Sequence, residues 1–303
     1  MVNPDPFWLC VIFIVGASVG SFVNVVILRL PRGESLANPP SHCPVCGKTL
    51  SFFDMIPVLS YVALRGKCRH CGCRISPMYP LVESFMGILF LYLGYRYGLT
   101  LLFFRQAVLL GLLLAVTVID IREMLIPDEL VLSGAVFWVS FLALSKVLSA
   151  WVQGPLKLLC EFPVFTKAAA EATFHATTDR VGAGLLGPPT CSEDLIGDLA
   201  RGLLGGALGF LVFLAISLVT RGMGGGDVKL AGMCGLYLGP ALTILAVFIA
   251  FVSGGVVAAL LLLSGKARAK SHIPYGPFIA LGAAISSLWG EQIILWYLAR
   301  LLP

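Results

Sequence analysis

Residues 101–119 have the sequence LLFFRQAVLLGLLLAVTVI, an apolar run with only one charged side chain, Arg105, and Asp120 follows it directly. A helix needs roughly 20 mainly apolar residues to cross the hydrocarbon core of a bilayer. The run therefore predicts a membrane-spanning helix that ends on a carboxylate.

The rest of the chain has the same apolar character. Of its 303 residues, 58% are hydrophobic and only 12% are charged, whereas about 25% of the residues of a soluble domain carry charge. We therefore predict an all-α polytopic membrane protein with about eight transmembrane helices. The other apolar stretches, of which 228–238 is the shortest and is rich in glycine, lie at about 7–28, 80–97, 129–149, 201–220, 228–238, 240–263 and 277–300.

Basic residues in the connecting loops predict the orientation of these helices. Lys and Arg are concentrated in the loop at 29–79 and in the loop near 264–276. Because such loops stay in the cytoplasm, we expect the amino terminus outside and both Asp120 and Asp227 at the cytoplasmic face. Residues 7–28 have no basic residue ahead of their apolar run, so we interpret them as a retained anchor rather than a signal peptide. The net charge of +5 is then mostly a topology signal, and we infer no nucleic-acid partner from it.

An insertion at about 150–200 interrupts the apolar pattern with Gly, Pro and scattered charges. The topology places it outside. Its Cys160 and Cys191 have two interpretations: a disulfide, if the insertion faces an oxidising compartment, or two unpaired thiols. No pattern in the insertion indicates its function.

The loop at 29–79 contains two CxxC pairs, Cys43-Pro-Val-Cys46 and Cys68-Arg-His-Cys71. Two such pairs supply the four thiolates of a tetrahedral structural zinc site, which leaves no open position for chemistry. Structural disulfides are disfavoured because the cytoplasm keeps thiols reduced. A redox site is the alternative, and for zinc the fourth ligand is the least defined, since Cys73 and His70 are potential replacements. We expect the metal to fold this loop, which has too few apolar residues for a core.

Asp120 and Asp227 both stand where apolar sequence meets the cytoplasmic face. A carboxylate at membrane depth is unfavourable by about 2.5–3.5 kcal/mol on insertion scales, so each is a candidate functional residue. The alternative for each is an ordinary helix-end charge that reaches the headgroup zone.

The glycines that precede Asp227, Gly224, Gly225 and Gly226, favour the functional interpretation. A glycine run lets the backbone approach another backbone or a substrate, and irregular backbone at membrane depth is tolerated only where protein buries it or a wet cavity borders it. Two carboxyl groups around one water cannot both ionise. The ionised one can then take a proton from the water while the protonated one polarises a peptide carbonyl. The pattern predicts peptide hydrolysis.

Two functions of other classes compete with this hypothesis. A proton-coupled transporter also uses carboxylates in the membrane, but it does not explain the glycine run or the cysteine loop. A structural scaffold of a secretion complex would use the cysteine loop as a docking surface, and it predicts that both aspartates are dispensable.

With these residues assembled, the chain resembles the bacterial type IV prepilin peptidases, leader peptidases and N-methyltransferases of the GxGD aspartyl protease family. The resemblance covers nearly the whole chain apart from the insertion. Besides the two CxxC pairs, it rests on ordered motifs at 20–31, 56–61, 64–68, 79–83, 118–128, 222–230 and 273–277.

The resemblance implies that Asp120 and Asp227 are the catalytic pair. It implies cleavage of a short basic leader on the cytoplasmic side, after a glycine and before a phenylalanine, and methylation of the new amino terminus with S-adenosylmethionine. The implied partners are prepilins or pseudopilins, membrane lipid and the pilus or type II secretion assembly machinery, and the implied location is the bacterial inner membrane. No glycine-rich fingerprint for the methyl donor is present, so that activity rests on the resemblance alone.

The same resemblance divides the chain into two parts. Residues 1–79 contain the first helix, the zinc loop and the methyl-transfer half, and residues 80–303 form the peptidase core. Glu83 is a candidate contact for the methyl donor, although an acid near a helix amino terminus is favourable in any case. Lys229 either lowers the pKa of Asp227 or anchors the helix at the membrane face. We expect Asp128 to cap a helix and Asn24 to bond a neighbouring helix.

Overall fold

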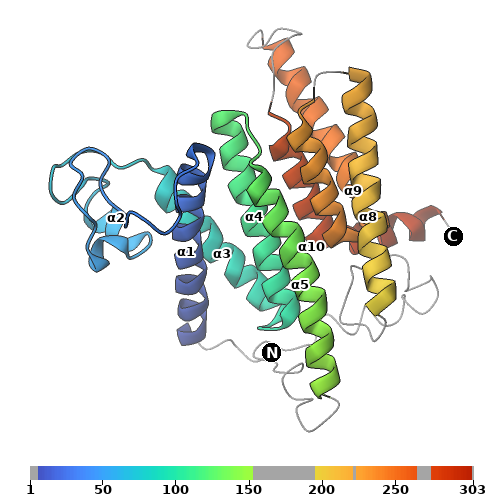
Figure 1. The fold of residues 1–303 in the computed structure, drawn as a ribbon, viewed down its shortest axis with the longest axis horizontal. Coiled ribbons are helices and arrows are strands. Elements are labelled where there is room, and N and C mark those ends of the chain that lie inside the picture. The colour runs from blue at the N-terminus through green and yellow to red at the C-terminus, as the bar shows by residue number, and fades with distance from the viewer. Residues whose placement is uncertain (1–5, 153–194, 221–222, 265–273, 302–303) are drawn as a thin grey trace. The chain divides into compact units, whose positions relative to one another are not determined.

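The computed structural model describes residues 6–152, 195–220, 223–264 and 274–301 (Figure 1). Seven of the described helices are long and apolar enough to cross a membrane, which confirms an all-α polytopic membrane protein. They are α1 (Pro6–Arg29), α3 (Met78–Tyr97), α4 (Leu101–Glu123), α5 (Asp128–Val152), α8 (Leu195–Thr220), α9 (Gly225–Leu263) and α10 (Gly276–Leu301). The loop between α1 and α3 carries the short helices η1 (Leu30–Arg32), η2 (Phe52–Met55) and α2 (Leu59–Ala63).

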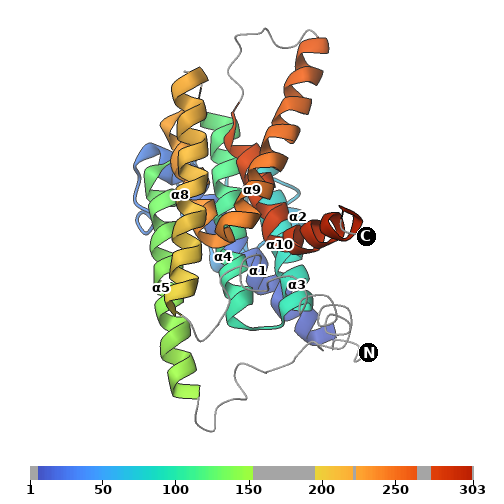
Figure 2. The same cartoon turned by 90° about the vertical axis from the view of Figure 1, so that its right-hand side faces the viewer.

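Helix α9 accounts for the difference between seven helices and about eight predicted spans. It has 39 residues, about 58 Å at 1.5 Å per residue, far more than the roughly 30 Å hydrocarbon core. Gly239 inside it has φ 73° and ψ 172°, and Pro240 follows. Proline has no N–H and its ring collides with the preceding turn, so the helix kinks here (Figure 2). The predicted spans 228–238 and 240–263 are the two halves of α9.

The described residues form two compact units, one up to Ala107 and one from Val108 onward. In the first unit α1 packs closely against α3. Gly16 of α1 faces Phe90, and Gly20 faces the Cα atom of Glu83, so that a Cβ atom at either glycine would collide. The Asn24 side-chain amide donates a hydrogen bond to the Tyr79 carbonyl at 3.1 Å, which confirms the predicted bond between helices.

In the second unit α9 packs against α5, α8 and α10 (Figure 1). Small residues allow the closest approaches, as is usual for helices in a membrane. The backbones of Gly205 on α8 and Gly235 on α9 are in direct contact, and Gly282 of α10 lies against the carbonyl of Ala246 on α9. These contacts set the position of α8 against the first half of α9 and that of α10 against the second half.

Most of the predicted insertion at about 150–200 lies outside the described residues. Helix α5 ends at Val152 and α8 begins at Leu195, so Cys160 and Cys191 are among the residues not described. The interpretations of these two cysteines therefore stay predictions.

A valine at Gly205 is expected to destabilise the second unit. Its side chain would collide with the backbone of Gly235 and Gly239, and overpacking of this kind costs about 1–3 kcal/mol. We expect the Tm of the purified protein in detergent to fall for Gly205→Val. The matched control is Gly255→Val on α9, where a Cβ atom meets nothing within 4 Å. An equal Tm for the two variants would contradict the close α8–α9 contact.

Candidate functional site

Asp120 lies near the carboxyl end of α4, and the protein buries it. Its side chain is only 5% exposed, and its Oδ2 atom accepts a hydrogen bond of 2.8 Å from the backbone N–H of Gly276, the first residue of α10. A Cβ atom at Gly276 would lie 2.7 Å from the same oxygen. Glycine is therefore required at this position for the backbone to reach the carboxyl group.

Asp227 lies in the first turn of α9 and is bonded in a similar way. It is 9% exposed, and its Oδ2 atom accepts a hydrogen bond of 3.2 Å from the backbone N–H of Gly224. This bond closes the first turn of the helix, because the carboxylate satisfies an N–H that has no partner within the helix.

The structure brings these two aspartates together at one end of the second unit. The carboxyl end of α4 meets the amino end of α10 through the bond from Gly276 to Asp120, and the amino end of α9 meets the start of α5. The two carboxyl groups are close enough to interact electrostatically. For each, the Oδ1 atom has no hydrogen-bond partner among the described residues. One oxygen of each acid is therefore not held by any described protein group.

The glycines before Asp227 are not equivalent. A Cβ atom at Gly226 would lie 2.9 Å from the Cβ atom of Ile126, whereas at Gly225 it would meet nothing within 4 Å. Gly224 has φ −72° and ψ 153°, which any residue adopts. Close packing against Ile126, rather than an unusual backbone conformation, thus explains the need for glycine, and only Gly226 requires it.

Lys229 does not bond Asp227. Its ammonium group lies 2.8 Å from Oδ1 and 2.7 Å from Oδ2 of Asp128, the first residue of α5. Both side chains are more than half exposed, and such pairs contribute about 0–1 kcal/mol. The pair joins α5 to α9 beside the aspartates.

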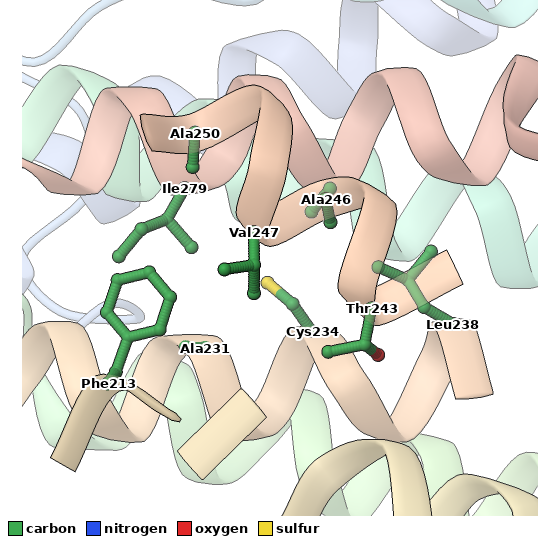
Figure 3. A pocket seen from close by; sticks show the side chains of 10 residues that line it. Phe213, Ala231, Cys234, Leu238, Thr243, Ala246, Val247, Ala250 and Ile279 are labelled. Carbon is green, nitrogen blue, oxygen red and sulfur yellow. The ribbon is translucent and has the colours of Figure 1, made fainter. Parts of the chain in front are cut away.

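The space between three helices of the second unit is lined mainly by apolar side chains. A cavity of about 10 Å³ lies between α8, α9 and α10, bordered by Phe213, Cys234 and Ile279 among others (Figure 3). One water needs about 10–15 Å³ and polar partners, so this cavity does not admit a peptide. Cys234 is buried there as a small hydrophobic side chain, as its apolar surroundings in the sequence predict.

The four predicted zinc ligands, Cys43, Cys46, Cys68 and Cys71, form a cluster in the first unit, with their sulfur atoms all within 4.8 Å of one another. The two CxxC pairs have the same local fold. The N–H of Cys43 bonds the carbonyl of Lys48, and the N–H of Cys68 bonds the carbonyl of Cys73. Gly47 and Gly72 turn the chain with φ of 69° and 70°, a region that favours glycine.

Without a bound cation, the thiols of this cluster have very different pKa values. Backbone N–H groups of Cys46 and Val45 lower the pKa of Cys43 to about 6. The pKa of Cys71 is raised to about 11, because the effects of burial and the neighbouring sulfurs exceed that of a backbone N–H that lowers it. A divalent metal ion removes this difference, because the thiols that bind it lose their protons. The cluster therefore fits a structural metal ion such as zinc.

Cys73 is a fifth thiol at the edge of this cluster. Its sulfur lies 3.5 Å from that of Cys43, close to the 3.8 Å between the sulfurs of Cys43 and Cys71. Among the described residues, the group that can hold a metal contains neither Cys73 nor His70.

Glu83 is buried in α3 and holds the loop that precedes α2. Its Oε2 atom accepts a hydrogen bond of 2.8 Å from the backbone N–H of Val58. Val58 has φ 62°, an outlier for a β-branched residue. The sequence did not indicate this anchoring contact, and the contact of Glu83 with a methyl donor stays a prediction.

Comparison with known proteins places the chain in a family. A sequence model of the type IV leader peptidase family matches residues 189–259, and one of the bacterial peptidase A24 N-terminal domain matches residues 14–97. The prepilin leader peptidase/N-methyltransferase of Bacillus subtilis is 33% identical over 96% of this chain and 98% of its own length. The chain belongs to the type IV leader peptidase family.

Other members of the family align over a similar length. The prepilin leader peptidase/N-methyltransferases of Stutzerimonas stutzeri and Pseudomonas aeruginosa are each 30% identical over 98% of this chain and 95% of their own lengths. No solved structure matches the chain.

Replacing Gly276 by alanine is expected to impair cleavage of a leader peptide by this family member. The new methyl group would collide with Oδ2 of Asp120, and displacing a reacting group by about 1 Å reduces rates by about 100-fold. We expect such a loss for Gly276→Ala in a leader-cleavage assay. Gly225→Ala, where the methyl group meets open space, is expected to cleave normally. Normal cleavage by Gly276→Ala would exclude a role for this contact.

The cysteine cluster is expected to bind about one zinc ion per chain. Elemental analysis of the purified full-length protein checks this, and the double variant Cys43→Ser/Cys46→Ser should lose the metal. Cys73→Ser is the matched control and should keep it. Loss of zinc in the control, or its retention in the double variant, would contradict this ligand set.

Proposed function

We propose that this chain is an intramembrane aspartyl endopeptidase that cuts type IV prepilins or pseudopilins, with Asp120 and Asp227 as its catalytic pair. One observation carries the proposal: two buried carboxyl groups from different helices interact at one end of the second unit, each held through a single oxygen by a glycine N–H. Membership of the type IV leader peptidase family identifies the substrate class.

The pair would act on a peptide through one water molecule. The oxygens that accept no hydrogen bond would hold this water, while the bonds from Gly276 and Gly224 fix the orientation of both carboxyl groups. Two carboxyl groups that hold one water about 3 Å apart share one proton, and such a pair titrates as a unit. One carboxylate therefore stays ionised as the base, and the other stays protonated as the acid.

Hydrolysis then follows from these two states. The ionised carboxylate takes a proton from the water while the water oxygen bonds to the peptide carbonyl carbon. The protonated carboxyl group donates its proton to the carbonyl oxygen. The carboxyl group that took the water proton passes it to the leaving nitrogen as the C–N bond breaks, and the hydroxyl formed from the carbonyl oxygen returns its proton to the other carboxylate. The products are a leader with a new carboxylate and a mature chain with a new amino terminus.

We further propose that the site faces the cytoplasm of a bacterial inner membrane, with the amino terminus of the chain outside. The basic loop between α1 and α3 supports this orientation, because Lys-rich and Arg-rich loops stay in the cytoplasm. The helix ends at Asp120 and Asp227 then lie on the side of the membrane that holds the basic leader of the substrate. The cleaved bond is the one between a glycine and a phenylalanine.

The second activity that we propose is N-methylation of the new amino terminus, with S-adenosylmethionine as the methyl donor. The match of residues 14–97 to the N-terminal domain and the names of the relatives support it. The sulfonium of this donor supplies the methyl group. In the first unit, a zinc ion held by Cys43, Cys46, Cys68 and Cys71 would shape the loop between α1 and α3 without taking part in the transfer.

The catalytic pair can be tested with isosteric variants. We expect Asp120→Asn and Asp227→Asn each to lower the rate of prepilin cleavage by about 10²–10⁴-fold, the usual contribution of a positioned acid or base. The measurement is cleavage of a purified prepilin by the purified enzyme in detergent. Asp128→Asn is the matched control, since this exposed acid lies at the start of α5 and pairs with Lys229.

The alternative functions give different results in this assay. A transporter or a scaffold would not cleave prepilin at all, and a scaffold would tolerate loss of both acids. Cleavage at the normal rate by either asparagine variant would reject the shared-water mechanism.

A further inference from the structure

Tyr275 is a half-buried aromatic residue immediately before α10. Its ring packs against those of Phe213, Phe251 and Phe278, with centroid distances of 6.1, 5.8 and 5.7 Å. Gly254 lies against the same ring: a Cβ atom at this glycine would lie 3.0 Å from the ring. These neighbours hold the ring in place and limit its freedom to turn its hydroxyl group toward water.

The hydroxyl group of Tyr275 is buried and has no hydrogen-bond partner among the described residues. Buried tyrosine hydroxyls usually find a partner, because leaving one unpaired is unfavourable. Tyr237 in the same unit follows this rule: its hydroxyl donates to the Gly134 carbonyl at 2.8 Å. A hydroxyl group with no partner in the described part of the chain is therefore unusual.

Two observations place Tyr275 next to the catalytic pair. The backbone N–H of the next residue, Gly276, bonds Asp120. Burial, together with the nearby charge of Asp227, raises the pKa of Tyr275 to about 12. The phenol consequently keeps its proton at neutral pH and can act as a neutral donor.

We propose that the Tyr275 hydroxyl donates a hydrogen bond to the carbonyl oxygen of the peptide bond being cut, as a third catalytic residue. The inference rests on the proposed function and extends it. The carbonyl oxygen gains negative charge as water adds to the carbon, and a donor already in place stabilises that charge. The phenol keeps its proton, and no bond forms to Tyr275. Its missing partner is supplied by the substrate.

The test is Tyr275→Phe, which keeps the ring and removes only the hydroxyl group. We expect kcat for prepilin cleavage to fall by about 10²–10³-fold, as when an oxyanion donor is removed, with KM within about twofold because the bond strengthens in the transition state. Tm should stay equal or rise, since an unpaired buried hydroxyl is lost.

Tyr237→Phe is the matched control. It removes a paired hydroxyl and leaves the Gly134 carbonyl without its donor, so its Tm should fall while kcat stays within about twofold of the wild type. Tyr275→Phe should thus lower kcat without lowering Tm, whereas Tyr237→Phe should lower Tm without lowering kcat.

Each contrary result has a distinct meaning. Normal kcat in Tyr275→Phe, with both asparagine variants inactive, would overturn this inference and leave the proposed function standing. A fall of Tm in Tyr275→Phe would also overturn it, because the hydroxyl would then have a structural partner. A wild-type protein that cuts no prepilin would instead overturn the proposed function.

Discussion

The second unit depends on a backbone N–H reaching each of two buried carboxyl groups. An acid at membrane depth is tolerated only where it is paired or hydrogen-bonded, and Gly276 and Gly224 supply these bonds. At Gly276 even a methyl group would collide with the carboxyl oxygen that it bonds. Consequently the end of α4 and the start of α10 must converge within the length of a hydrogen bond.

The packing of the helices follows from this convergence. Glycine on α8 and α9 lets their backbones touch at Gly205 and Gly235, and the Asp128–Lys229 pair joins the starts of α5 and α9. The kink at Gly239 and Pro240 divides α9, so that its first half carries Asp227 and its second half packs with α10. A rigid apolar frame thus positions a polar site at helix ends.

Different interactions shape the loop of the first unit. The loop between α1 and α3 leaves many of its large apolar side chains exposed, and its two CxxC turns collect four sulfurs within 4.8 Å. Glu83 adds a hydrogen bond from within α3 to the strained Val58. A cluster of four cysteines and a buried acid therefore shape a loop that directly adjoins membrane helices.

The sequence by itself determined the class of fold, the cysteine ligand set and the two candidate aspartates. Each of these depends on local information: the length of apolar runs, the CxxC spacing, and the unfavourable energy of an acid in lipid. Only the tertiary structure decided which groups meet. Gly276 is 156 residues from Asp120, and Lys229 is 101 residues from Asp128, so no periodicity connects them. The same holds for the packing of Gly226 on Ile126 and for the Tyr275 hydroxyl, which has no partner among the described residues. Hydrogen bonds and steric contacts depend on distances that only the folded chain sets.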